Sequence, residues 1–236
     1  PVDEAVDQDA RLPSWTAMRF RWKSVVSVGL VAVVLAIPVR ALMRYQGPPM
    51  EEGFMLVFPE RLLAGDMPHK DFLHLYGPGS LWALAGWYKL VGVSITAERV
   101  FGLAQLAGIV FGVMALVWPW GRRVATAAGI LGVLLTTTAI GLTALAWDGA
   151  VAFIVASVWV GLRARRWLTD TDDPPTAAAL GRADRLLVGS GVLAGLALLF
   201  RPDAIVATGL ATLGLMAGLG WGRWKRWLLG AVPVVS

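Results

Sequence analysis

The feature that most constrains this chain is a series of long apolar blocks. Residues 24–39, 101–117 and 124–142 contain no charged side chain. Blocks of roughly 17–25 such residues match the thickness of the hydrocarbon core of a bilayer. Hydrophobic residues make up 57% of the chain and charged residues 16%, which is too little charge to cover a soluble domain of this length. The sequence therefore predicts an all-α, polytopic transmembrane protein.

The apolar blocks predict about seven membrane spans. We expect them near residues 24–43, 100–118, 124–142, 149–163, 186–200 and 204–221, with a last, incomplete one starting at 228. Residues 1–23 are polar and of mixed charge, which predicts a cytoplasmic tail ahead of an uncleaved anchor. Residues 24–236 would form the membrane module. Because the chain starts without methionine and stops inside an apolar run, we expect a missing C-terminal portion or a partner subunit.

The block at 79–95 is ambiguous because it is short, follows Gly77-Pro78-Gly79 and contains Lys89. If it spanned the membrane, the arginines and lysines of the later loops would lie on the outer face. If it lies at the membrane surface, they fall on the cytoplasmic side, as topology signals usually do. We therefore expect a surface-lying helix within an outer loop at 45–98, and a flexible cytoplasmic loop at 164–185. This arrangement predicts a multi-pass protein of the plasma membrane with a cytoplasmic N-terminus.

Two broad classes of function are excluded at this stage. The chain has no cysteine, which rules out disulfides, thiolate metal sites and a cysteine nucleophile. Its net charge of +5 would fit a nucleic-acid partner, but the lysines and arginines sit at the ends of apolar blocks. Those positions are typical of topology signals and of contacts with lipid phosphates.

Three acidic residues on the predicted outer face are candidates for catalysis. Glu51 and Glu52 follow the first span almost directly, and a carboxylate there suits general-base work on a hydroxyl. The alternative is an acidic cap on a surface helix. Asp148 lies in a short turn between two apolar spans, where a carboxylate is costly and often functional. It is equally suited to cap the helix that begins at Gly149.

Two arginines on the same face are candidates for binding a donor phosphate. Arg201 ends an apolar span and Arg99 begins one, and arginine makes bidentate contacts with phosphate. The alternative partners are the neighbouring carboxylates, Asp203 for Arg201 and Glu98 for Arg99.

The outer loop also contains a dense run of glycine, proline and polar residues. Asp66, His69, Asp71 and Tyr76 are candidates for a loop that contacts substrate, since such punctuation beside a membrane requires a folded loop. With His74, the first three could bind a metal, although their spacing matches no recognised metal motif. The sequence thus requires no cofactor and leaves a divalent cation as an open alternative.

The run from Glu51 to Gly92, EEGFMLVFPERLLAGDMPHKDFLHLYGPGSLWALAGWYKLVG, resembles the first outer loop of the GT-C glycosyltransferases. These polytopic enzymes use polyprenyl-phosphate sugars and include bacterial and actinobacterial arabinofuranosyl- and mannosyltransferases. The likeness covers most of the chain, strongly over 51–99 and diffusely afterwards. The family usually has further spans and often a soluble outer domain.

The resemblance implies roles for individual residues. The acidic pair of the family, usually Asp-Glu or Asp-Asp, matches Glu51 and Glu52, so the first position departs from the common pattern. Asp148 matches an acidic residue of the next outer loop. Arg201, in GLALLFRPD, matches a basic residue that follows a Gly-Leu-rich span.

The resulting hypothesis is a membrane glycosyltransferase. One carboxylate of Glu51 and Glu52 would deprotonate an acceptor hydroxyl of a cell-envelope glycan, lipid or protein, which attacks a polyprenyl-phosphate monosaccharide with inversion. Asp148 would orient the acceptor or stabilise positive charge, and Arg201 with Arg99 would hold the leaving phosphate. Arabinose and mannose both fit. The alternatives are a transporter or flippase, which predicts charges at mid-membrane depth, and a non-catalytic membrane scaffold.

Overall fold

The computed structural model describes residues 22–45, 47–138, 141–169 and 176–235, and this part of the chain is helical with no strand. A lone β-bridge joins Pro68 and Phe72. The elements are α1 (Trp22–Leu42), α2 (Pro49–Leu63), α3 (Pro78–Val91), α4 (Ile95–Val117), η1 (Trp118–Trp120), α5 (Arg122–Thr136), α6 (Ala146–Thr169), α7 (Ala177–Phe200), η2 (Pro202–Ala204), α8 (Ile205–Met216) and α9 (Trp221–Val235). The prediction of an all-α protein is confirmed.

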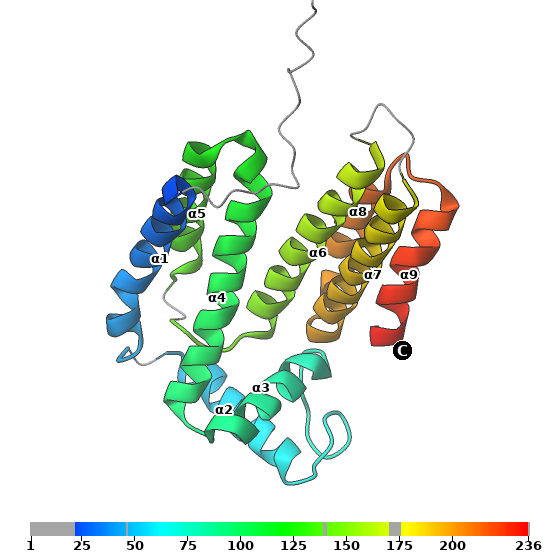
Figure 1. Cartoon of the computed structure of the whole chain (residues 1–236). Coiled ribbons are helices and arrows are strands. Elements are labelled where there is room, and N and C mark those ends of the chain that lie inside the picture. Colours follow the sequence, from blue (N-terminus) through cyan, green and yellow to red (C-terminus); the bar gives the residue numbers. More distant parts are fainter. Residues whose placement is uncertain (1–21, 46, 139–140, 170–175, 236) are drawn as a thin grey trace, which may run out of the picture.

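The long helices form two groups that meet where α4 packs on α6 (Figure 1). One group, α1, α4 and α5, has an apolar core that includes Val31, Val110 and Met114. The other, α6 to α9, is centred on residues such as Leu187 and Met216. The short helices α2 and α3 lie across one end of both groups (Figure 1).

Four helices are long and apolar enough to cross a membrane: Trp22–Leu42, Ile95–Trp120, Ala146–Thr169 and Ala177–Phe200. A membrane protein is therefore supported, and the count of about seven spans stays a prediction. The other three expected spans correspond to shorter helices. Helix α5 ends at Thr136, before the predicted limit of 142, and residues 139–140 lie outside the described part.

The cytoplasmic loop predicted at 164–185 is shorter in the structure. Helix α6 continues to Thr169 and α7 begins at Ala177, with Thr176 as its N-cap; residues 170–175 lie outside the described part. Alanine, leucine and arginine are strong helix formers, and they fill both margins of the predicted loop. Residues 1–21 of the predicted tail also lie outside the described residues.

Close contact between α7 and α9 depends on glycine. A Cβ at Gly191 would overlap the carbonyl oxygen of Trp227, and one at Gly230 would overlap that of Val188. Small residues of this kind let membrane helices approach closely.

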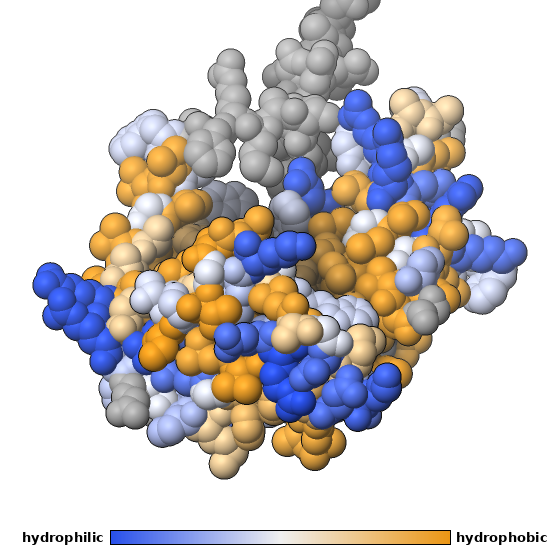
Figure 2. All heavy atoms as spheres, turned by 90° about the horizontal axis from the view of Figure 1, so that it is seen from below, coloured by the Kyte–Doolittle hydropathy of each residue, from blue (hydrophilic) through white to orange (hydrophobic). Residues whose placement is uncertain are grey.

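The ambiguous block at 79–95 forms α3, which lies at the end of the bundle beside α2 and not among the long helices (Figure 1). Helix α3 ends at Val91 and is followed by Gly92, whose φ of 86° favours glycine, and Ser94 then caps α4. Seen from this end, hydrophobic and hydrophilic side chains are mixed over the surface (Figure 2). Leu75 and Leu90 are 77% and 81% exposed there, and such a mixed surface is typical of a membrane boundary.

Candidate pocket at the α2–α3 end

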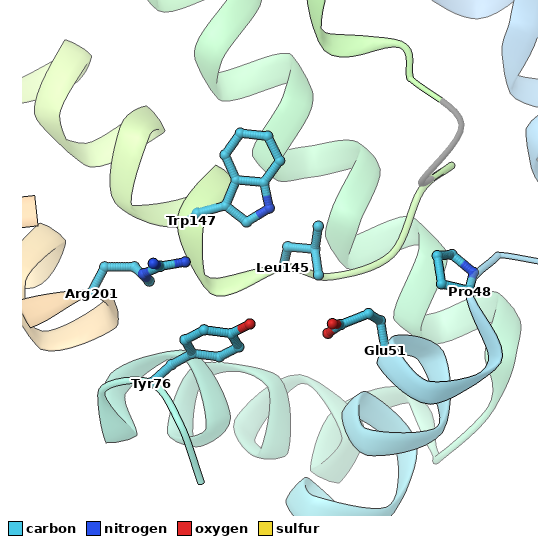
Figure 3. A pocket seen from close by; sticks show the side chains of 6 residues that line it. All are labelled: Pro48, Glu51, Tyr76, Leu145, Trp147 and Arg201. Carbon is cyan, nitrogen blue, oxygen red and sulfur yellow. The ribbon is translucent and has the colours of Figure 1, made fainter. Parts of the chain in front are cut away.

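A pocket of about 420 Å³ opens at the end of the bundle that carries α2 and α3 (Figure 3). It is lined by Pro48, Glu51, Tyr76, Leu145, Trp147 and Arg201. These residues come from four separate segments of sequence. The Glu51 carboxylate and the Tyr76 hydroxyl point toward each other, and Arg201 lies beyond Tyr76, on the side away from Glu51 (Figure 3). A carboxylate and a guanidinium therefore face a shared space.

Glu51 reaches the pocket from the first turn of α2. Pro48 precedes the helix and Pro49 starts it, a position where the missing N–H of proline costs nothing. Consecutive residues on a helix point about 100° apart. Glu52 accordingly turns inward and is 8% exposed, while Glu51 stays half-buried at the pocket wall.

Glu52 is bound to Arg99 of α4. Its Oε1 accepts a hydrogen bond from Nε at 2.8 Å and lies 2.7 Å from Nη2 in an ion pair, and Arg99 Nη1 donates to the carbonyl of Met43 at 2.7 Å. A Cβ at Gly47 would lie only 2.8 Å from the carboxyl carbon of Glu52. The partner of Arg99 is thus Glu52 and not the neighbouring Glu98 that the sequence offered. Neither residue of the pair lines the pocket.

Glu98 is a buried carboxylate that the sequence reasoning did not select. Its side chain is 0% exposed, and Oε1 accepts a hydrogen bond of 2.5 Å from the backbone N–H of Ala144. Its Oε2 has no hydrogen-bond partner within the described residues. The available signal was its place at the start of an apolar span, where a carboxylate needs a buried partner.

Arg201 lines the pocket and also binds Asp203. Its Nε donates to Asp203 Oδ1 at 2.7 Å, Nη2 binds the second carboxylate oxygen, and the guanidinium lies 4.8 Å from the centre of the Tyr76 ring. The hydrogen bonds from Arg201 lower the pKa of the Asp203 carboxyl below its usual value. Arg201 therefore forms the salt bridge with Asp203 that the sequence analysis gave as the alternative to phosphate binding. Its guanidinium still borders the pocket.

A second pocket of about 270 Å³ adjoins the first. It shares Trp147 and Arg201 with it, and the remaining lining is mostly apolar: Ala150, Val151, Ile154, Asp203, Ala204 and Ala207. These residues belong to α6, to η2 and to α8. Arg201 is thus at the junction of the pocket that contains Glu51 and this mostly apolar one.

Glycine explains why Tyr76 meets Arg201. The N–H of Gly77 donates to the carbonyl of Phe200 at 3.1 Å. A Cβ at Gly77 would overlap the carbonyl oxygen of Leu199. The loop before α3 therefore sits directly on the last turn of α7, which ends at Arg201.

Asp148 lies in the first turn of α6 and is 7% exposed. It follows Trp147 but is not among the residues that line the pocket. Within the described residues it forms no ion pair. The structure thus brings Glu51, Tyr76 and Arg201 together, with Asp148 buried behind the wall.

The other loop candidates lie in a turn beside α2. Asp66 binds Arg61 Nε at 2.7 Å, and Asp71 accepts a hydrogen bond from the N–H of Met67 at 2.8 Å. The ring of His69 lies 6.2 Å from that of His74. Neither Asp66, nor His69, nor Asp71 lines the pocket. Over the described ranges, no group of three or more histidine and carboxylate side chains is arranged to hold a metal ion.

His74 is packed between rings. It is 3% exposed and makes edge contacts with Phe58 and Tyr76. Burial, reinforced by the nearby His69, lowers the pKa of His74 from 6.5 to about 4. The neutral imidazole therefore belongs to the folded loop that carries Tyr76.

Comparison with protein-family models, curated proteins and solved structures finds no match to this chain.

Proposed function

We propose that this chain is a membrane glycosyltransferase that transfers a monosaccharide from a polyprenyl-phosphate donor to an acceptor hydroxyl. The observation that carries the proposal is that the Glu51 carboxylate and the Arg201 guanidinium line one pocket, with Tyr76 between them (Figure 3). The resemblance of residues 51–99 to GT-C enzymes supports the same reaction. The pocket would lie on the outer face of the plasma membrane, because the basic loops occupy the opposite end of the bundle.

In the proposed step, Glu51 removes the proton from the acceptor hydroxyl. The acceptor oxygen forms a bond to the anomeric carbon as the bond from that carbon to the phosphate oxygen breaks. The electron pair leaves with the polyprenyl phosphate, and Arg201 stabilises the charge that develops there. Glu51 is preferred to Glu52 as the base because Glu52 is bound to Arg99.

The two adjoining pockets support an amphiphilic donor. Arg201 borders both of them, so a phosphate bound there would have its sugar in the first pocket, near Glu51. The mostly apolar pocket between α6 and α8 would hold the first isoprene units. Trp147 and Tyr76 would offer the aromatic surface on which sugar rings commonly pack.

The test is a transfer assay in membranes with labelled polyprenyl-phosphate arabinose and mannose. We expect Glu51→Gln to lower the rate by about 10²–10⁴-fold, the usual cost of losing a general base. Glu60→Gln, an exposed carboxylate on the same helix, is the matched control. Asp148→Asn and Arg201→Gln test the supporting roles, and parallel assays with and without EDTA test the divalent cation.

Transfer that persists in Glu51→Gln would overturn the assignment of the base. If neither donor supports transfer, the transporter and scaffold alternatives are favoured.

A further inference from the structure

Glu98 and Arg99 open α4 yet contribute no side chain to the pocket. They are 0% and 6% exposed. Their partners lie in three other segments, at Met43, Glu52 and Ala144. Two consecutive buried side chains thus connect the end of α1, the start of α2 and the segment before α6.

Arg99 acts on the Glu51 side of the pocket. By holding Glu52 at 2.7–2.8 Å it fixes the rotation of the first turn of α2, and the adjacent Glu51 is directed to the pocket as a result. The bond to Met43 ties this turn to the chain that leaves α1.

Glu98 acts on the side of the pocket that Leu145 and Trp147 line. Its carboxylate holds the N–H of Ala144, and a Cβ at Gly102 would overlap the carbonyl oxygen of Leu142. The segment 142–144 is therefore pressed onto α4. The residues that follow it, Leu145 and Trp147, line the pocket.

Stability alone does not account for this arrangement. Burying charged groups costs free energy that their mutual attraction repays only in part. Glu52 and Glu98 carry two carboxylates against the single guanidinium of Arg99, and Glu98 Oε2 lacks a partner among the described residues. In some proteins, buried polar and ionic groups fix the position of the segments that they join.

We infer that Glu98 and Arg99 are positioning residues for the pocket, Arg99 mainly for the wall with Glu51 and Glu98 mainly for the wall with Trp147. The inference rests on the proposed function for its catalytic consequence, but the geometry can be tested without it.

The chain has no cysteine, so single cysteines report on each wall. Glu51→Cys and Trp147→Cys are made in the full chain, reconstituted in lipid, and the rate of alkylation by a soluble maleimide is followed by mass spectrometry. Each is combined with Arg99→Gln and with Glu98→Ala. We expect Arg99→Gln to change the rate at position 51 by about tenfold and Glu98→Ala to change the rate at position 147 similarly.

The two cysteines are controls for each other, because each second-site change should alter the rate at its own wall more than the rate at the other. Glu98→Gln keeps an oxygen acceptor for Ala144 and should behave as the parent. Rates that stay unchanged at both positions, or that change equally at both, would overturn the inference.

The kinetic consequence is measured separately. We expect Arg99→Gln to lower kcat by about 10²-fold, as misplacement of a reacting group does, with the KM for the donor retained and partial rescue in Arg99→Lys. A loss confined to KM contradicts positioning of Glu51. If instead the parent protein transfers neither sugar, the proposed function fails, while the alkylation rates still decide the roles of Glu98 and Arg99.

Discussion

Arg99 and Glu52 form a buried ion pair across 47 residues of sequence, with 2.7 Å between Nη2 and Oε1. We expect Arg99→Ala to lower the free energy of unfolding by about 3–5 kcal/mol, because Glu52 would remain as a buried charge without its partner. The double variant Arg99→Met with Glu52→Leu should cost clearly less than the sum of the single changes. Denaturant unfolding in detergent measures the coupling, and additive costs would show that the pair is not formed.

Glu98 has one carboxylate oxygen without a partner among the described residues, so a conservative change there should cost little stability. Glu98→Gln keeps an acceptor for Ala144 and removes a buried negative charge, so stability should stay within about 1–2 kcal/mol of the parent or rise. Glu98→Ala removes the acceptor and should be destabilising. A melting temperature for Glu98→Gln well below that of Glu98→Ala would contradict this account.

The glycine before α3 makes a steric prediction. Gly77→Ala would force a methyl group onto the carbonyl of Leu199, and we expect a loss of about 1–3 kcal/mol. The matched control is Gly86→Ala within α3, where a Cβ meets open space and stability should stay the same or rise by up to about 1 kcal/mol. Thermal unfolding compares the two. Equal effects would mean that α3 does not rest on the end of α7.

His74 predicts a pH dependence of stability. Its pKa is about 4 in the fold and near 6.5 when unfolded, so the unfolded chain binds the extra proton between these values. The stabilisation is complete above pH 6.5 and is lost as the pH falls toward 4, by up to about 3 kcal/mol. His74→Phe, which keeps the ring contacts with Phe58 and Tyr76, should flatten unfolding curves over this window. An unchanged slope would show that His74 is not the responsible group.

The sequence predicted what depends on local pattern. The apolar blocks indicated the helical membrane fold, and the Gly77-Pro78-Gly79 turn with the charge distribution indicated that 79–95 lies apart from the long helices. Glu51 was selected as a carboxylate that follows the first span almost directly, and Arg201 as an arginine at the end of an apolar span on the same predicted face.

What the sequence left open depends on contacts between distant segments. The rotation of α2 decides that Glu51 faces the pocket while Glu52 faces Arg99, and sequence adjacency alone treats the two glutamates alike. The same limit applies to Arg99, for which the neighbouring Glu98 was the obvious partner. Trp147 and Leu145 line the pocket because α6 and the segment before it pack against α4, a contact between distant segments.

The position of Arg201 at the junction of two pockets has a kinetic consequence. An amphiphilic ligand with a charged head and an apolar tail would occupy both pockets. Its tail would stay in the bilayer, so the ligand would reach the protein by lateral diffusion in two dimensions. The quantity that governs occupancy is then its mole fraction in the bilayer. Diluting the protein with inert lipid would slow such a reaction, whereas adding buffer would leave it unchanged.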